Sequence, residues 1–206
     1  MDVISLKLFL YLIIVLSAVF HEYAHGFMAY RLGDSTAKDA GRLTLNPLAH
    51  LDLMGTVAIP LFLLFTSGIF IGWAKPVPYN PYNLRDQKYG SLKVGLAGPA
   101  ANLFIALIMG LILRFSGSLA IFAGQPVFLE LVALIIYINI VLALFNLIPL
   151  PPLDGSKVIM DLFPRSRYFV ERAGFFGIFI ALILAFYFLP PLANFVFRII
   201  AGSFLF

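Results

Sequence analysis

The sequence contains no cysteine among its 206 residues. This absence excludes disulfide bonds and thiolate ligands, so a metal ion could be held only by histidine, aspartate or glutamate. Charged residues are also scarce, since they make up 12% of the chain while 62% of it is hydrophobic. Soluble globular domains are closer to half apolar. We therefore expect an integral membrane protein in a lipid bilayer.

The chain also lacks any internal repeat, low-complexity tract or polar linker, so we expect one domain over residues 1–206. Its net charge of +4 could indicate nucleic-acid binding. The basic residues, however, lie in loops between apolar segments, where they report orientation in the membrane, and we expect no nucleic-acid partner. The first apolar segment has no small-residue cleavage site, so we expect a retained helix and not a signal peptide.

A polar motif interrupts that first apolar run, which extends from about Ile4 to Tyr30. His21, Glu22 and His25 form the pattern His-Glu-x-x-His. Ionisable side chains in a membrane helix are costly, and they indicate a functional site facing the protein interior. Two histidines at positions i and i+4 share one face of a helix, with the spacing that two ligands of a tetrahedral zinc ion need.

Glu22 adjoins the first of these histidines and could act as the general base of a metal-assisted hydrolysis. Two other interpretations of the motif remain open at this point. The side chains could form a satisfied polar network between packed helices, or a proton relay in a transporter.

The apolar pattern predicts an all-α polytopic membrane protein with about five transmembrane helices. Segment 55–72 has only about 18 residues and contains Pro60, so a re-entrant segment is an alternative to a full crossing. Alternation from Arg42 to Asn46, followed by proline, suggests a short surface strand near 42–46. The apolar segments are 4–30, 55–72, 94–113, 127–148, 173–189 and 190–206.

Lysine and arginine favour the re-entrant form of segment 55–72. With a full crossing, the loops carry nine basic residues on one side and four on the other. With a re-entrant segment the division is eleven against two, and loops 31–54, 73–93 and 149–172 share the basic side. The positive-inside rule then places these loops in the cytoplasm. We expect a protein of the cell (inner) membrane whose site faces the cytoplasm.

Asp154 is the best candidate for a third metal ligand, which a catalytic zinc site needs beside one open position. Three nearby prolines prevent a continuous helix before it. Irregular backbone at membrane depth occurs where it is buried in protein or lines a cavity, although a surface turn is an equal alternative from these residues alone. The re-entrant topology brings His21, His25 and Asp154 to the same leaflet.

Other candidate residues have simpler interpretations. Glu130 lies near the start of an apolar segment and is expected to be solvated. His50 in the surface loop is expected to be structural or solvated, with a role in gating as the alternative. The small residues before Asn102 are more typical of helix packing than of a site. The loop Trp73 to Tyr89 holds the single tryptophan among tyrosines and prolines, and we expect it to anchor the protein at the headgroup level.

Three motifs in this order resemble the site-2 protease family of intramembrane zinc metalloproteases: His-Glu-x-x-His, then Gly-Pro-x-x-Asn, then Asn-x-x-Pro-x-x-Pro-x-Asp-Gly. The resemblance covers about residues 15 to 160. It implies one zinc ion per chain, held by His21, His25 and Asp154, with Glu22 as the catalytic base. The chain resembles the compact branch, without the peptide-binding or nucleotide-sensing domains of other members.

The resemblance also implies residues that bind the substrate. Asn102 and Asn146 match the two asparagines of the family motifs, which help to position the substrate or to stabilise the oxyanion. The family's strand that pairs with an extended substrate falls on about Arg42 to Asn46, and so on Leu43, Thr44 and Leu45.

We therefore expect an endopeptidase that cuts a peptide bond in or near the transmembrane segment of a membrane protein. The alternative is a metal or proton transporter that uses the same buried ligands, but no repeated halves of the kind that transporters usually have are found in the sequence. A catalytically silent scaffold is a third hypothesis, which the retention of all four polar residues of the site disfavours.

Overall fold

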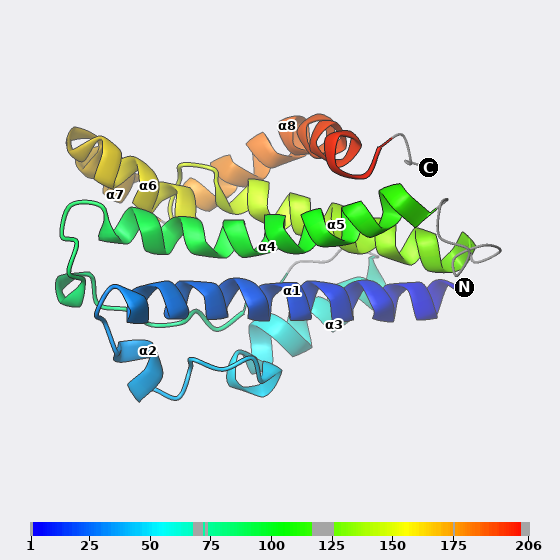
Figure 1. Ribbon diagram of the computed structural model, residues 1–206, viewed down its shortest axis with the longest axis horizontal. Helices are drawn as coiled ribbons and strands as arrows, with labels where there is room; N and C mark the ends of the chain where they lie inside the picture. The colour runs from blue at the N-terminus through cyan, green and yellow to red at the C-terminus, as the bar shows by residue number, and fades with distance from the viewer. Residues whose placement is uncertain (1, 68–71, 73, 117–125, 175, 203–206) are drawn as a thin grey trace. The chain divides into compact units, whose positions relative to one another are not determined.

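The computed structural model describes residues 2–67, 72, 74–116, 126–174 and 176–202 (Figure 1). Helices dominate this part of the chain, and no strand occurs in it. The chain divides into two compact units, Met1–Gly98 and Pro99–Phe206. A single domain over residues 1–206 stays a prediction.

Four helices within the described ranges are long and apolar enough to cross a membrane. Only 22% to 33% of the most apolar window of each helix is buried inside the protein. Apolar side chains therefore point outward as well as inward, which is typical of helices that lie in lipid. An all-α polytopic membrane fold is confirmed. The four helices are α1 (Val3–Arg31), α4 (Gly90–Phe115), α5 (Pro126–Asn146) and α8 (Phe176–Ala201).

The number of transmembrane helices stays a prediction, but the division expected at the C-terminal end is wrong. Segments 173–189 and 190–206 were expected to cross separately, but α8 runs through Pro190 and Pro191 as one helix. A proline removes one backbone hydrogen bond and kinks a helix. In an apolar environment, no water is present to form hydrogen bonds with free backbone N–H and C=O groups. A helix that continues through a proline leaves fewer of these groups without a partner than a helix that ends there.

In the first unit, α1 begins at an N-cap residue, Asp2, whose side chain accepts a hydrogen bond from the backbone N–H of Ser5. The C-terminal part of α1 packs in a core with the loop before α4 and the beginning of α4, through Ala29, Leu84 and Val94. The shorter elements between α1 and α4 are α2 (Thr36–Asp39), η1 (Pro47–Ala49), η2 (Leu53–Ala58), α3 (Ile59–Thr66) and η3 (Pro81–Asn83).

The apolar helix formed by η2 and α3 lies beside α1 and runs toward its N-terminal half (Figure 1). Tyr11 donates a hydrogen bond to the carbonyl of Thr56, and Lys7 donates one to the carbonyl of Leu64. The backbone N–H of Lys75 donates to the carbonyl of His50, so the two ends of the intervening segment lie together, as in a hairpin.

Leu53–Thr66 is shorter than the roughly 20 residues that a spanning helix needs. A re-entrant segment at 55–72 is consistent with this length and with the joined ends, and it stays a prediction. Residues 68–71 of this segment, and Trp73 of the predicted surface anchor, lie outside the described residues.

The short surface strand predicted near residues 42–46 is wrong. The backbone N–H of Arg42 donates to the carbonyl of Ala37, and the carbonyl of Thr44 accepts from the ring of His50. The Asn46 side chain accepts from the N–H of Leu48 and caps η1. The segment folds onto local partners because the described part of the chain offers it no second strand.

In the second unit, α5 and α8 pack together with α4, and the Arg114 side chain donates to the carbonyl of Ile199 near the end of α8. After α5 the chain contains a cis peptide bond between Pro151 and Pro152. It continues through α6 (Asp154–Leu162), η6 (Pro164–Ser166) and α7 (Arg167–Ala173). The buried core of the unit consists of Ala106, Leu113, Val132, Ala133, Ile136, Ile140, Ala193, Phe197 and Ala201.

Candidate metal centre and catalytic residues

The two histidines of the motif lie on one face of α1 and are both buried. The ring centroids of His21 and His25 are 4.6 Å apart, and the ring planes make an angle of 84°. One helical turn separates the residues, so the helix itself sets this distance. The pair has the arrangement that the spacing in the sequence predicted.

A contact with a backbone carbonyl indicates the tautomer of His25. Its Nδ1 atom lies 2.6 Å from the carbonyl oxygen of Val94. A carbonyl can only accept, so Nδ1 carries the proton and Nε2 of the neutral ring carries the lone pair. Metal-binding histidines are oriented in this way, with one nitrogen donating to a carbonyl and the other directed at the metal.

Gly98 on α4 lies against both imidazoles. A Cβ atom at this position would be 2.5 Å from Nε2 of His21 and would collide with Nε2 of His25. The two Nε2 atoms therefore converge on the same backbone position, and only glycine leaves the space between them open. Two convergent imidazole nitrogens, one of fixed tautomer, fit a zinc ion.

Glu22 follows the first histidine and is half-buried. Its Oε2 atom accepts a hydrogen bond of 2.7 Å from the backbone N–H of Val77. The carboxylate is therefore held in one orientation by a loop residue 55 positions away in the sequence. The side chain of Val77 also packs against α1 at Gly26: a Cβ atom added at Gly26 would lie only 2.9 Å from Cγ1 of Val77.

Asp154 belongs to the second unit, where it begins α6 and is only 6% exposed. Its Oδ1 atom accepts a hydrogen bond of 2.7 Å from the Lys157 ammonium. The next residue, Gly155, lies so close to the end of α5 that a Cβ would be 2.5 Å from the carbonyl oxygen of Ile148. Asp154 is thus a buried carboxylate that pairs with Lys157 at the start of a helix, and a freely solvated surface turn is wrong.

Comparison with known proteins identifies the family of this chain. A Bacillus subtilis (strain 168) protein named "Putative zinc metalloprotease YwhC" is 38% identical over 197 residues, which are 94% of this chain and 85% of the relative. Residues 114–189 match the model of Peptidase family M50. The chain belongs to this site-2 protease family. It is a zinc metalloprotease and an integral membrane protein.

More distant relatives carry similar names. The Mycolicibacterium smegmatis protein named "Putative zinc metalloprotease Rip2" is 31% identical over 82% of this chain and 63% of its own length. The "Zinc metalloprotease MJ0392" of Methanocaldococcus jannaschii is 22% identical over 79% of this chain and 36% of its own length. No solved structure matches the chain.

The two motif asparagines of this M50 protease have partners within the second unit. The Asn102 amide donates 2.9 Å to Oδ1 of Asn139, and both side chains are fully buried. The Asn146 amide donates to the carbonyl of Leu142, one turn earlier in α5. Contact of Asn102 and Asn146 with a substrate stays a prediction. Asn139 was missed, although it lies seven residues before Asn146 and so on the same helix face.

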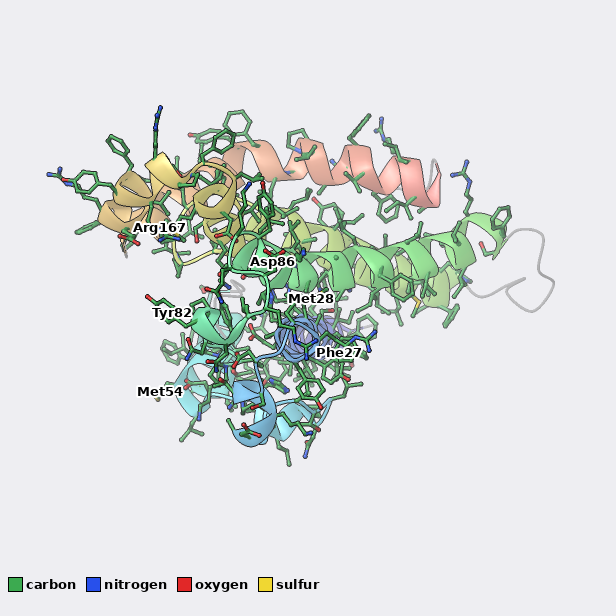
Figure 2. The ribbon with its side chains drawn as sticks, turned by 60° about the vertical axis from the view of Figure 1, so that its left-hand side comes forward. Phe27, Met28, Met54, Tyr82, Asp86 and Arg167 are labelled. Atoms are coloured by element: carbon green, nitrogen blue, oxygen red, sulfur yellow. The ribbon has the colours of Figure 1, made fainter. Side chains whose placement is uncertain are left out.

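The surface loop contains the third histidine of the M50 protease. His50 is 1% exposed, and its Nε2 donates to the carbonyl of Thr44. These are the contacts of a structural histidine, which is one of the two expected environments, and a solvated side chain is wrong. Glu130 is exposed, also as expected. Tyr82 is 86% exposed and points outward from η3 (Figure 2), as suits a side chain at the headgroup level.

Sequence reasoning missed the roles of Gly98 and Val77. It interpreted the motif around Gly98 as helix packing and the loop around Val77 as a membrane anchor. The signal for Gly98 was available in the Gly-Pro-x-x-Asn motif. The contact of Val77 is made by a backbone N–H, which every residue except proline has, so the residue type gave no signal for it.

Proposed function

We propose that this M50 protease cuts a peptide bond within or beside the transmembrane segment of a membrane protein, in regulated intramembrane proteolysis. The supporting observation is the position of the two convergent histidines inside α1, a candidate membrane span. His21 lies ten residues before the end of the helix at Arg31, which corresponds to a depth of about 15 Å along the helix. A substrate bond would have to reach this depth.

In this proposal Nε2 of His21, Nε2 of His25 and the carboxylate of Asp154 hold one zinc ion per chain. The proposal for Asp154 rests on its burial and its charge. Three protein ligands leave the open position that catalysis needs. Zinc at such a site polarises the scissile carbonyl and lowers the pKa of water beside it.

Glu22 acts as the general base. Its carboxylate takes a proton from the attacking water and passes it to the leaving amine. One oxygen is held by the Val77 N–H, so the carboxylate approaches the reacting atoms from a defined direction.

A helical substrate must unwind before cleavage, since its carbonyls are hydrogen-bonded within the helix. We propose that the backbone of Leu43, Thr44 and Leu45 replaces these bonds by pairing with the extended substrate. Leu43 lies beside α1: a Cβ atom added at Gly26 would be 3.4 Å from the Cδ1 atom of Leu43. In this proposal Asn102 and Asn146 help to position the substrate or its oxyanion, and the site opens to the cytoplasmic side of the inner membrane.

The test compares two variants of the full-length protein with wild type in lipid. Glu22→Gln should bind about one equivalent of zinc and lose cleavage of a membrane-embedded substrate by about 100-fold or more, because the amide cannot accept the proton. Asp154→Ala should lose both zinc and cleavage. Metal analysis and a gel-based cleavage assay measure the two properties. Wild-type cleavage by Glu22→Gln would refute the role of Glu22, and full zinc retention in Asp154→Ala would refute the ligand set.

A further inference from the structure

Residues 75–80, here called the strap, pass beside the catalytic motif as a segment without regular secondary structure. We propose that the strap is a positioning device for Glu22, and that the backbone N–H of Val77 is the group that orients the carboxylate for proton transfer. This inference rests on the proposed function, in which Glu22 is the general base.

The sequence of the strap leaves one donor at its centre. Pro76 and Pro78 have no backbone N–H, so Val77 is the residue between them that can donate. A residue before proline is restricted to extended conformations, which applies to both Lys75 and Val77. The centre of the strap, residues 76–78, therefore presents a single N–H from a stiff, extended backbone.

Val77 makes two contacts with the same turn of α1. Its N–H donates 2.7 Å to Oε2 of Glu22, and its side chain packs at Gly26, four residues further along the helix. Val77 is itself buried, with 7% exposure. A hydrogen bond to an ionised carboxylate is about twice as strong as one between neutral groups, and burial shields it from water. Glu22 thus has one oxygen fixed on the strap.

The first end of the strap is tied through both backbone groups of Lys75. Its N–H donates 3.0 Å to the carbonyl of His50. Its carbonyl accepts a bond of 2.7 Å from the Arg42 guanidinium. Arg42 and His50 are both buried, so these contacts are made inside the protein.

The second end of the strap is tied to Asp34, a fully buried carboxylate that follows α1. Oδ2 of Asp34 accepts from the backbone N–H of Asn80 at 2.7 Å, and Oδ1 accepts from the Asn83 amide at 2.9 Å. Because Asp34 follows directly on the helix that carries Glu22, this tie sets the strap relative to that helix. Fixed ends on both sides of Val77 determine where its N–H lies.

A fixed carboxylate has a kinetic consequence. A displacement of about 1 Å in a catalytic group can reduce the rate by about 100-fold, even when substrate binding is unchanged. Removing the Val77 N–H should therefore lower kcat, while KM and zinc content stay as they were. A strap with only a structural role would instead change zinc content or the amount of folded protein.

The experiment removes this N–H from the full-length enzyme in lipid. Incorporation of α-hydroxyisovaleric acid at position 77 replaces the amide by an ester with the same side chain. Val77→Ala is the matched variant that keeps the amide and shortens the side chain, and Val77→Pro is a second way of removing the proton. We expect kcat of the ester and of Val77→Pro to be about 10- to 100-fold below that of Val77→Ala, with similar KM and about one equivalent of zinc.

Two further outcomes decide the inference. Equal kcat values for the ester and Val77→Ala would overturn it, and so would a loss of zinc that parallels the loss of kcat. In a Glu22→Gln background the ester should cause no additional loss, since two groups that act through one interaction are not additive. Wild-type cleavage by Glu22→Gln would refute the proposed function itself, whereas an inactive Glu22→Gln with a fully active ester would refute only the role of the strap.

Discussion

His25 shows what the sequence can and cannot say about a single residue of the site. Its place one turn after His21 follows from the motif, and so does the expectation that both side chains are buried ligands. Its tautomer follows instead from the carbonyl of Val94, 69 positions away. The same holds for Glu22, whose orientation depends on a backbone N–H of Val77. Residue types predict the chemistry, and contacts between distant residues orient it.

Gly98 gives a sharp test at this scale. In Gly98→Ala the added methyl group would collide with the Nε2 atoms of both histidines, so the rings must move apart. We expect zinc affinity to fall by about 10- to 100-fold, which is typical of changes beside metal ligands. Competition with a chelator measures this affinity.

The matched control is Ala100→Ser, an exposed position on the same helix, which should keep zinc as wild type does. Unchanged zinc affinity in Gly98→Ala would contradict the convergence of the two rings on this position.

Among the elements, long apolar helices were predicted well because their signal is spread over many residues. The errors concern elements whose outcome depends on partners. Segment 42–46 alternates like a strand but bends onto His50 and η1. Pro190 and Pro191, where two predicted segments were divided, lie inside the single helix α8 (Phe176–Ala201), since a proline that would end a helix in water can be accommodated in an apolar environment. Local patterns alone could not settle either case.

The strap is an element whose stability should depend on Asp34. Burial alone would raise the pKa of this carboxyl, but hydrogen bonds from Thr36, Asn80 and Asn83 lower it below its ordinary value of 3.8. A lowered pKa in the folded state contributes stability above the ordinary value, and this contribution is lost as pH falls through the folded pKa. We expect amide exchange over residues 74–84, corrected for its intrinsic rate, to stay slow down to about pH 4 and to accelerate below it.

In Asp34→Asn, the backbone amides of residues 74–84 should exchange faster than in wild type at neutral pH. The asparagine side chain has one acceptor oxygen, whereas the carboxylate has two, so it cannot accept from all of the same donors. The same substitution at the exposed Asp39, whose side chain accepts from Ser35, serves as the control. Slow exchange in Asp34→Asn at pH 7 would show that the strap is held without this carboxylate.

For the whole molecule, membrane orientation was inferred from charge and not from contacts. Apart from Arg198, which lies within the last apolar segment, the basic residues divide eleven to two only if segment 55–72 returns to the side it came from. The hydrogen bond between Lys75 and His50 agrees with this arrangement, because it joins the two ends of that segment.

The absence of cysteine makes the orientation easy to measure. Single cysteines at the exposed positions Ala40, Gln87 and Arg165 should react with an impermeant maleimide only from the cytoplasmic side, and Ser5→Cys should react from outside. Zinc-dependent cleavage by each cysteine variant can be measured to check that the variant is folded. Labelling of Gln87→Cys from outside would mean that segment 55–72 crosses the bilayer.

The sequence by itself determined the membrane class, the positions of most long helices and the residue types that are capable of metal-binding and acid–base chemistry. It could do so because apolar runs, motif spacing and ionisable side chains are local properties of the chain. Only the tertiary structure decided which backbone groups meet these side chains: the carbonyl of Val94 at His25, the backbone of Gly98 against the two Nε2 atoms and the N–H of Val77 at Glu22. Every residue offers the same backbone atoms, so their partners follow from packing over long sequence distances and not from residue type.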